Sequence, residues 1–137
     1  MSKKEQIIQA AGKRKTAIAR ATLRPGKGII RVNKIPIDKL NPKVVRHRIM
    51  EPLLLLGDDI RLSVDADVLV AGGGITCQAD AVRIALCRGL CKLVGGSVRE
   101  TLVAYDRTLL VADTRVKEKS KPNCHGMARS KRQKSYR

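Results

Sequence analysis

The sequence IRLSVDADVLVAGGGITCQADAVRIALCRGLCKLV, residues 60–94, contains two different hydrophobic periodicities joined by three glycines. Apolar and polar residues alternate over 60–71, which predicts a long strand with one face on a core. From about Cys77 to Val94 apolar residues recur instead at helical spacing, on a stripe made by Ala79, Val82, Leu86, Leu90 and Leu93. The segment therefore predicts a strand, a Gly72–Gly74 turn and a helix.

The segments before this unit show further strand and helix patterns. Residues 16–24 alternate small apolar residues with a polar face that presents Arg20 and Arg24 together, which predicts a half-buried strand. A turn at 25–28 then leads into a second strand over 29–33, so these two strands are expected to form a hairpin. Helical spacing follows from Val45 to Leu56 and is interrupted by Pro52, which predicts a kinked helix or two short ones.

The segments after this unit complete the predicted order of elements. Residues 98–105 are expected to form a short helix, and the apolar run 109–112 is a strand candidate. Strands and helices in this order predict an α+β fold in which a layer of helices packs on a mixed sheet. With 137 residues, the chain suits one domain. We expect a globular domain over 1–114 and an extended basic tail over 115–137.

The positive charge lies mainly at the two ends of the chain. The net charge is +17, and 1–31 and 115–137 each contain nine basic residues and one acid. The middle segment, 32–114, contains eleven basic and ten acidic residues. A nearly neutral middle with basic ends is typical of a domain that contacts a polyanion through its terminal segments.

Nucleic acid is the polyanion that the composition favours. No apolar run is long enough to span a bilayer, and the basic tail has no apolar stripe for a membrane surface. No secretory signal is visible, so a cytoplasmic location with reduced thiols is expected. The chain has no Phe or Trp and only two Tyr, which excludes a domain that reads bases on a platform of aromatic side chains.

Two basic groups are the main candidates for phosphate contacts. The cluster Lys13–Lys15 continues into Arg20 and Arg24 on one strand face, and a rigid row of cations can follow a nucleic-acid backbone. The tail offers a second set that can become ordered on RNA. Its candidate RNA contacts are Arg115, Lys117, Lys119, Lys121, Arg129, Lys131 and Arg132.

The glycine turn and Arg83 each have two interpretations. The Gly72–Gly74 turn, with Gly73 at its centre, could hold a phosphate at a helix N-terminus, or it could be a tight turn where only glycine fits. Arg83 could lie over the edge of the core, or it could point at a phosphate beside the turn. Both alternatives stay open at this stage, and Gly73 and Arg83 are kept as candidate RNA contacts.

No catalytic, metal or cofactor site is expected. Cys77, Cys87, Cys91 and Cys124 lack the paired spacing of a zinc knuckle, so packing is the favoured role for these cysteines. The histidines do not combine with Ser, Cys or Asp in a catalytic order. The protein is therefore not expected to be an enzyme.

Four segments in order resemble the small-subunit ribosomal protein S-nine family. They are Gly12–Ala17, Gly72–Gly74 with Gln78-Ala79 and Val82-Arg83, Tyr105-Asp106-Arg107 through Asp113-Thr114-Arg115, and Arg132–Arg137. The ending Gln-Lys-Ser-Tyr-Arg is similar to the archaeal and eukaryotic branch of that family.

This resemblance implies an α+β fold of the ribosomal S-five domain-two type. It implies binding to small-subunit rRNA in the head of the subunit, next to other ribosomal proteins, with no membrane partner. It also implies that the tail reaches the anticodon stem-loop of the P-site tRNA through Arg137, with Lys134 and Tyr136 nearby. The alternatives are a free RNA chaperone and, further away, a small nucleotide-binding enzyme that uses Gly72–Gly74.

Overall fold

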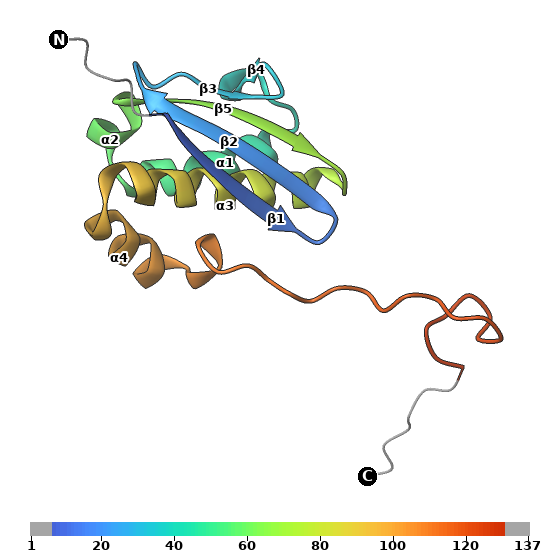
Figure 1. Ribbon diagram of the computed structural model, residues 1–137. Coiled ribbons are helices and arrows are strands. Elements are labelled where there is room, and N and C mark those ends of the chain that lie inside the picture. The colour runs from blue at the N-terminus through green and yellow to red at the C-terminus, as the bar shows by residue number, and fades with distance from the viewer. Residues whose placement is uncertain (1–6, 131–137) are drawn as a thin grey trace.

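The computed structural model describes residues 7–130 and places five strands and four α-helices in that part of the chain (Figure 1). The strands are β1 (Ile8–Arg14), β2 (Ala17–Pro25), β3 (Ile30–Val32), β4 (Ile35–Pro36) and β5 (Val64–Ala71). The helices are α1 (Lys43–Leu55), α2 (Asp58–Leu62), α3 (Ile75–Val94) and α4 (Gly96–Tyr105). Short 3-10 turns η1 (Ile37–Lys39) and η2 (Arg107–Leu109) complete the set. The predicted α+β class is confirmed.

The five strands form one mixed sheet in the order β1-β2-β5-β3-β4. β2 pairs antiparallel with both β1 and β5, whereas β3 pairs parallel with β5. The alternation in β2 has the predicted effect, because Ala17, Ala19, Ala21 and Leu23 are buried while Arg20 and Arg24 face outward. The strand β1 was not predicted, and it contains Lys13 and Arg14 of the basic cluster.

The hairpin expected between β2 and β3 is wrong, because β5 lies between these two strands. The connection after Pro25 wraps around the start of β5 instead of reversing onto β2. The Asp65 carboxylate accepts hydrogen bonds from the backbone N–H groups of Lys27 (2.9 Å) and Ile29 (2.8 Å). These two bonds hold the pKa of Asp65 below its usual value.

The long strand expected over 60–71 begins only at Val64, because residues 58–62 form α2. Gly57 has φ +86 and ends the preceding segment, and two aspartates occupy the first turn of α2. Acidic side chains are favourable at this end of a helix dipole. Ile60 and Leu62 are two residues apart, and such a short run cannot distinguish a strand from one turn of helix.

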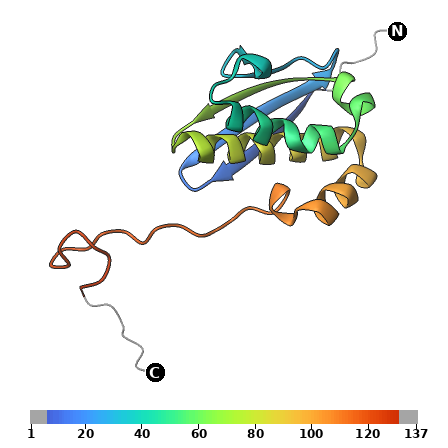
Figure 2. The same ribbon diagram turned by 180° about the vertical axis from the view of Figure 1, so that it is seen from behind.

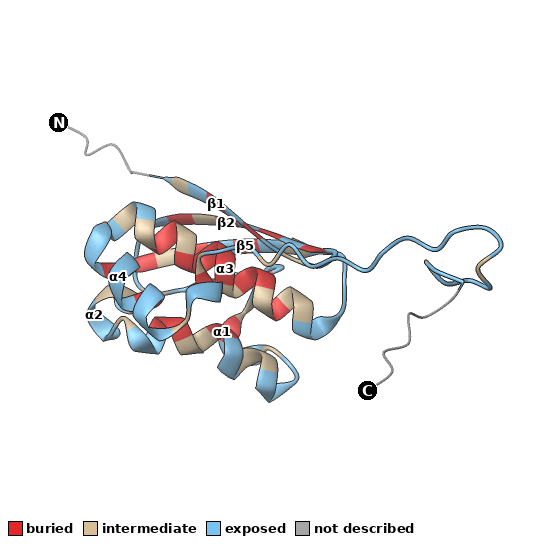
Figure 3. Ribbon diagram, turned by 90° about the horizontal axis from the view of Figure 1, so that it is seen from below, coloured by how far each residue is buried: buried red, intermediate tan, exposed pale blue. Residues whose placement is uncertain are grey.

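All the helices lie on one face of the sheet, with α3 in the centre (Figure 2). Buried residues gather between α3 and the strands, as Figure 3 shows in red. The backbones of β1 and α3 approach closely, since a Cβ on Gly12 would overlap the carbonyl of Ala81. The arrangement leaves the other face of the sheet open, with Leu69 and Ile18 among its exposed residues.

The strand expected at 109–112 is wrong, because this segment begins in η2 and continues without regular structure. The Asp106 carboxylate accepts from the backbone N–H of Thr108 at 2.8 Å, which caps a tight turn that buries Leu109. Beyond Ala112 the described chain runs away from the domain as an extended segment (Figure 1).

Candidate nucleic-acid interface

The cluster Lys13–Lys15 lies at the tip where β1 turns into β2. Lys13 and Arg14 are the last residues of β1, and Lys15 has φ +53 in the turn. Lys13 points to the open side of the sheet, because exposed and buried residues alternate along β1. The structure therefore places two of these cations, Lys13 and Lys15, towards solvent and turns the third towards the helices.

Arg14, the third member of the cluster, is held beside two aspartates in a pocket between β1, α3 and the segment after η2. Its guanidinium contacts the carboxylate of Asp113 and lies 3.8 Å from that of Asp80. Its side chain is 27% exposed. Arg14 thus already has anionic partners within the chain, which the sequence did not indicate.

Arg83 is the most enclosed of the predicted contacts, with a side chain only 13% exposed. It lies 3.1 Å from the Glu51 carboxylate of α1 and 4.0 Å from that of Asp80, and its Nε is buried without a hydrogen-bond partner among the described residues. Asp80 also accepts from Arg48 at 3.0 Å. These ion pairs bind α1 to α3, which favours the structural interpretation of Arg83.

Arg20 and Arg24 share the open face of the sheet, as predicted from the alternation in β2. Arg24 lies 3.5 Å from Asp67 on the neighbouring strand β5, and both side chains are half exposed. Exposed pairs of this kind contribute little stability, so a phosphate can replace the carboxylate at small energetic cost. Arg20 lies across from Leu69 and forms no ion pair within residues 7–130.

Packing against the β1–β2 turn explains the first two glycines of the Gly72–Gly74 turn. Gly72 and Gly73 have φ +78 and +67, and a Cβ on Gly72 would lie 2.5 Å from the carbonyl oxygen of Thr16. Gly74 has open space around it and precedes α3. The tight-turn interpretation therefore accounts for Gly72 and Gly73, while a phosphate contact at Gly73 stays a prediction.

The described part of the tail contains one closed loop. The backbone N–H of Lys121 donates to the carbonyl of Met127 at 3.1 Å, and Ser120 Oγ donates to the carbonyl of Gly126 at 2.9 Å. The Glu118 carboxylate lies between Lys121 (3.1 Å) and Arg129 (3.2 Å), and these cations lower its pKa. One acid thus gathers two of the predicted RNA contacts at the base of the loop.

The other predicted tail residues divide into exposed ones and ones outside the described range. Arg115 lies 2.8 Å from Asp113, while Lys117 and Lys119 are exposed. Five predicted contacts lie outside the described residues, namely Lys131, Arg132, Lys134, Tyr136 and Arg137.

Sequence reasoning missed three cations on the opposite side of the domain from β3 and β4. They are Arg88 and Lys92 on α3 and Arg99 on α4. The spacing of Arg88 and Lys92, four residues apart on a helix, places them on one face and could have identified the pair. The prediction for this helix rested on its apolar stripe alone and did not consider the cations on its other faces.

The cysteines are free, and burial raises the pKa of Cys87 to about 12 and also raises that of Cys91. A buried, protonated thiol behaves as a small apolar side chain.

Over residues 7–130, no three potential metal ligands of the His, Cys, Asp or Glu type gather in one place. No helix in this same range is long and apolar enough to cross a membrane.

A small α+β domain with exposed cations and a basic extended segment is typical of proteins that bind RNA through its phosphates. The profile of the family described as "Ribosomal protein S9/S16" matches residues 12–137 of the chain. The chain belongs to this family, which is one of ribosomal proteins rather than enzymes.

The curated relatives cover nearly the whole chain. A protein of Methanothrix thermoacetophila named "Small ribosomal subunit protein uS9" is 48% identical over 133 residues, which is 96% of this chain and 99% of the relative. Proteins of the same name from two strains of Methanococcus maripaludis are 44% identical over 134 residues, with the same coverage. The resemblance to the S-nine family is thereby confirmed, and these relatives are archaeal.

Proposed function

We propose that the protein is a structural constituent of the small ribosomal subunit in the cytoplasm. The observation that carries this proposal is the family match over residues 12–137, supported by relatives that bear the name of a small-subunit protein. The charge distribution agrees with it, because the basic residues concentrate in 1–31 and 115–137. In this role the protein binds small-subunit rRNA in the subunit head beside other ribosomal proteins.

Recognition is of RNA shape and backbone rather than of bases. The two tyrosines are the only aromatic residues of the chain, so base stacking has few partners. Solvent-exposed cations at the β1–β2 tip and on the open sheet face, such as Lys13, Lys15 and Arg20, offer donors to phosphates. In the proposed arrangement, residues 1–114 dock on folded rRNA and residues 115–137 extend into it.

The tail adds a contact with a different partner. We propose that the C-terminal residues Lys134, Tyr136 and Arg137 reach the anticodon stem-loop of the P-site tRNA. The support is the ending Gln-Lys-Ser-Tyr-Arg, which is similar to the archaeal and eukaryotic branch of the family. The contact is electrostatic and involves no chemical step.

Co-sedimentation tests the ribosomal role. Tagged protein expressed in cells should sediment with small subunits in a sucrose gradient, in stoichiometric amounts, and stay there through a wash at moderate salt. Recovery of the protein only in the free fraction would overturn the proposal. A free RNA chaperone would instead bind rRNA fragments and random duplexes with similar affinity, which a competition experiment measures.

A further inference from the structure

A groove of about 460 Å³ lies between the edge strand β1, the helices α3 and α4, and the segment after η2. Three cations line it, namely Arg88, Lys92 and Arg99, and no carboxylate does so within the described chain. The half-buried Leu110 and the exposed Val111 form an apolar part of its wall. We call this feature the Arg88 groove.

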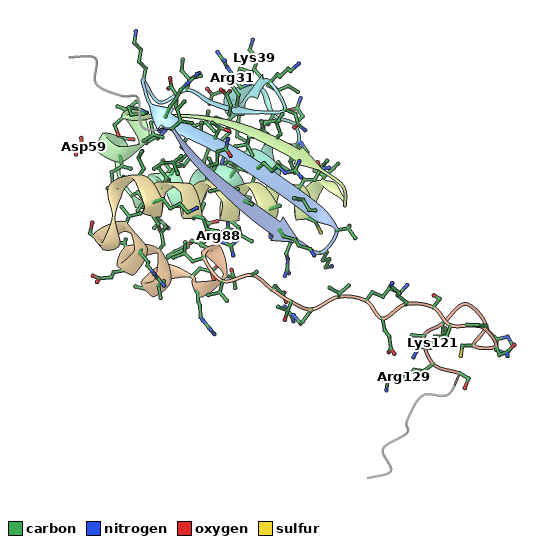
Figure 4. All side chains as sticks on the ribbon, viewed as in Figure 1. Arg31, Lys39, Asp59, Arg88, Lys121 and Arg129 are labelled. Atoms are coloured by element: carbon green, nitrogen blue, oxygen red, sulfur yellow. The ribbon has the colours of Figure 1, made fainter. Side chains whose placement is uncertain are left out.

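Hydrogen bonds to backbone carbonyls hold two of these cations in place. Arg88 donates from Nε (3.1 Å) and Nη2 (3.0 Å) to the carbonyl of Leu110, and from Nη1 (2.9 Å) to that of Ala11. Lys92 Nζ donates to the carbonyl of Gln9 at 3.2 Å. Figure 4 shows Arg88 reaching from α3 towards the η2 turn. Carbonyl groups orient a cation but do not cancel its charge, so the groove stays positive.

This distinguishes the Arg88 groove from several of the basic residues that the sequence singled out. Arg14, Arg24 and Arg115 each have an aspartate partner within the chain. Across residues 7–130, the three cations of the groove form no ion pair. Their charge is therefore available to an external anion without displacing a carboxylate.

The three cations of the Arg88 groove repel one another in the protein alone. Arg88 and Lys92 are like charges four residues apart on one helix, a spacing at which they repel each other. Arg99 of α4 adds a third positive charge to the same groove. A polyanion in the groove would relieve this repulsion and would release its own counterions at the same time.

We propose that the Arg88 groove binds the sugar-phosphate backbone of RNA. Lys92 and Arg99 contact phosphates, Arg88 supplies a fixed positive charge behind them, and Val111 packs against a ribose. The inference rests on the proposed function, in which the polyanion is small-subunit rRNA. It adds a second docking surface on the side of the domain that carries β1, α4 and η2, separate from the open face of the sheet.

Affinity for purified small-subunit rRNA, measured over a series of salt concentrations with the full chain, tests this inference. The double variant Lys92→Gln with Arg99→Gln removes two charges but keeps Arg88, which has structural bonds. Lys39→Gln with Lys43→Gln removes the same charge from exposed positions outside the groove. We expect the groove variant to bind about tenfold more weakly, with a salt slope shallower by about 2, since each phosphate contact contributes roughly one unit.

The affinity of the control variant for rRNA should fall by less than about threefold, with an unchanged salt slope. Exposed charges that do not contact a phosphate contribute little at physiological ionic strength. Equal losses of affinity in the two variants would overturn the proposal that the groove binds RNA. An unchanged affinity of the groove variant would also overturn it. Thermal unfolding of both variants checks that each is folded. If the wild-type chain itself fails to bind rRNA, the proposed function fails, which is a different result from a failure of the groove.

Lysine acetylation provides a second readout that needs no variant. In the complex with rRNA, Lys92 should be protected from an amine-reactive acetylating reagent, while Lys39 should react as in the free protein. Modification of Lys92 at the same rate in the free and bound protein would contradict the proposal.

Discussion

Arg14, at the end of β1, donates a hydrogen bond to the carboxylate of Asp113, 99 positions later in the chain. Asp113 also accepts from the side chain and the backbone N–H of Arg115, the first cation of the tail. One carboxylate therefore joins the β1–β2 tip to the point where the tail leaves the domain. The direction of the tail is set by this contact as well as by the packing of η2.

Replacing Asp113 by Asn should lower the melting temperature at neutral pH by a few degrees. Hydrogen bonds from Arg115 and Arg14 hold the pKa of Asp113 below its ordinary value of 3.8, so the folded state favours the ionised form. The carboxylate then stabilises the fold above about pH 4, and this contribution is lost as the pH falls through the folded pKa. The difference between wild type and variant should accordingly shrink in acid.

Thermal unfolding from pH 7 down to about pH 1.5 measures this effect, because the contribution of Asp113 is lost only below about pH 4, as the pH falls towards the folded pKa. Glu100→Gln is the matched control, because it removes one exposed carboxylate that forms no ion pair in residues 7–130. A pH-independent difference between wild type and Asp113→Asn would show that the charge of Asp113 does not stabilise the fold.

Gly72→Ala should reduce the free energy of unfolding by about 3 kcal/mol. Gly72 has φ +78, and the added Cβ would meet the Thr16 carbonyl oxygen, a backbone atom that cannot move aside easily. Gly74→Ala should change stability by less than about 0.5 kcal/mol, because no atom lies within 4 Å of its Cβ position. Urea unfolding of the two variants measures the contrast, and similar values would contradict the structure of the turn.

Tyr105 donates a hydrogen bond to Glu51, and this bond together with the charge of Glu51 raises the pKa of Tyr105 above 10.0. Glu51→Gln should therefore lower the pKa of Tyr105 towards its ordinary value. The chain has only two tyrosines, so Tyr136→Phe provides a background in which Tyr105 alone titrates. Ultraviolet absorbance of the tyrosinate against pH gives the result, with Glu100→Gln as control, and an unchanged pKa would exclude the Glu51 contact.

Deleting 134–137 should weaken P-site tRNA binding to small subunits by about tenfold while assembly of the subunit continues, because the segment carries two cations. Lys134→Gln with Arg137→Gln keeps the length of the tail and should reproduce most of the loss. Filter binding of tRNA to purified subunits measures the affinity. A failure of assembly would instead assign these residues to rRNA folding.

Local patterns were enough to predict the faces of β2 and α3. Alternation at Ala17, Ala19 and Ala21 and the helical stripe through Val82 and Leu86 depend only on neighbouring residues, and these five positions are buried. Leu93, at the end of the predicted stripe, is partly buried. The predicted hairpin after β2 failed because its outcome depends on a distant residue. Asp65 of β5 binds the backbone after Pro25, and no pattern within 25–33 contains that information.

In the candidate interface too, features that depend on neighbouring residues were predicted, and features that depend on distant residues were not. Outward exposure of Arg20 and Arg24 follows from strand periodicity, and the structure agrees. The ion pairs of Arg14 and Arg83 with Asp113 and Glu51 bring together residues far apart in the chain, so spacing cannot reveal them. The role of Arg88 was not predicted either, because its orientation depends on distant carbonyl groups of β1 and of the segment after η2.

The central position of β5 also has a consequence for synthesis of the chain. β2 and β3 both pair with β5, and neither pairs with the other. A nascent chain that has exposed only its first 63 residues therefore holds two unlinked hairpins, with the aliphatic faces of β2 and β3 in water. The sheet can close only when Val64–Ala71 emerges from the exit tunnel, and α3 must follow before those faces are covered. Until then these faces stay exposed to water, and a pause in translation within β5 would prolong that exposure.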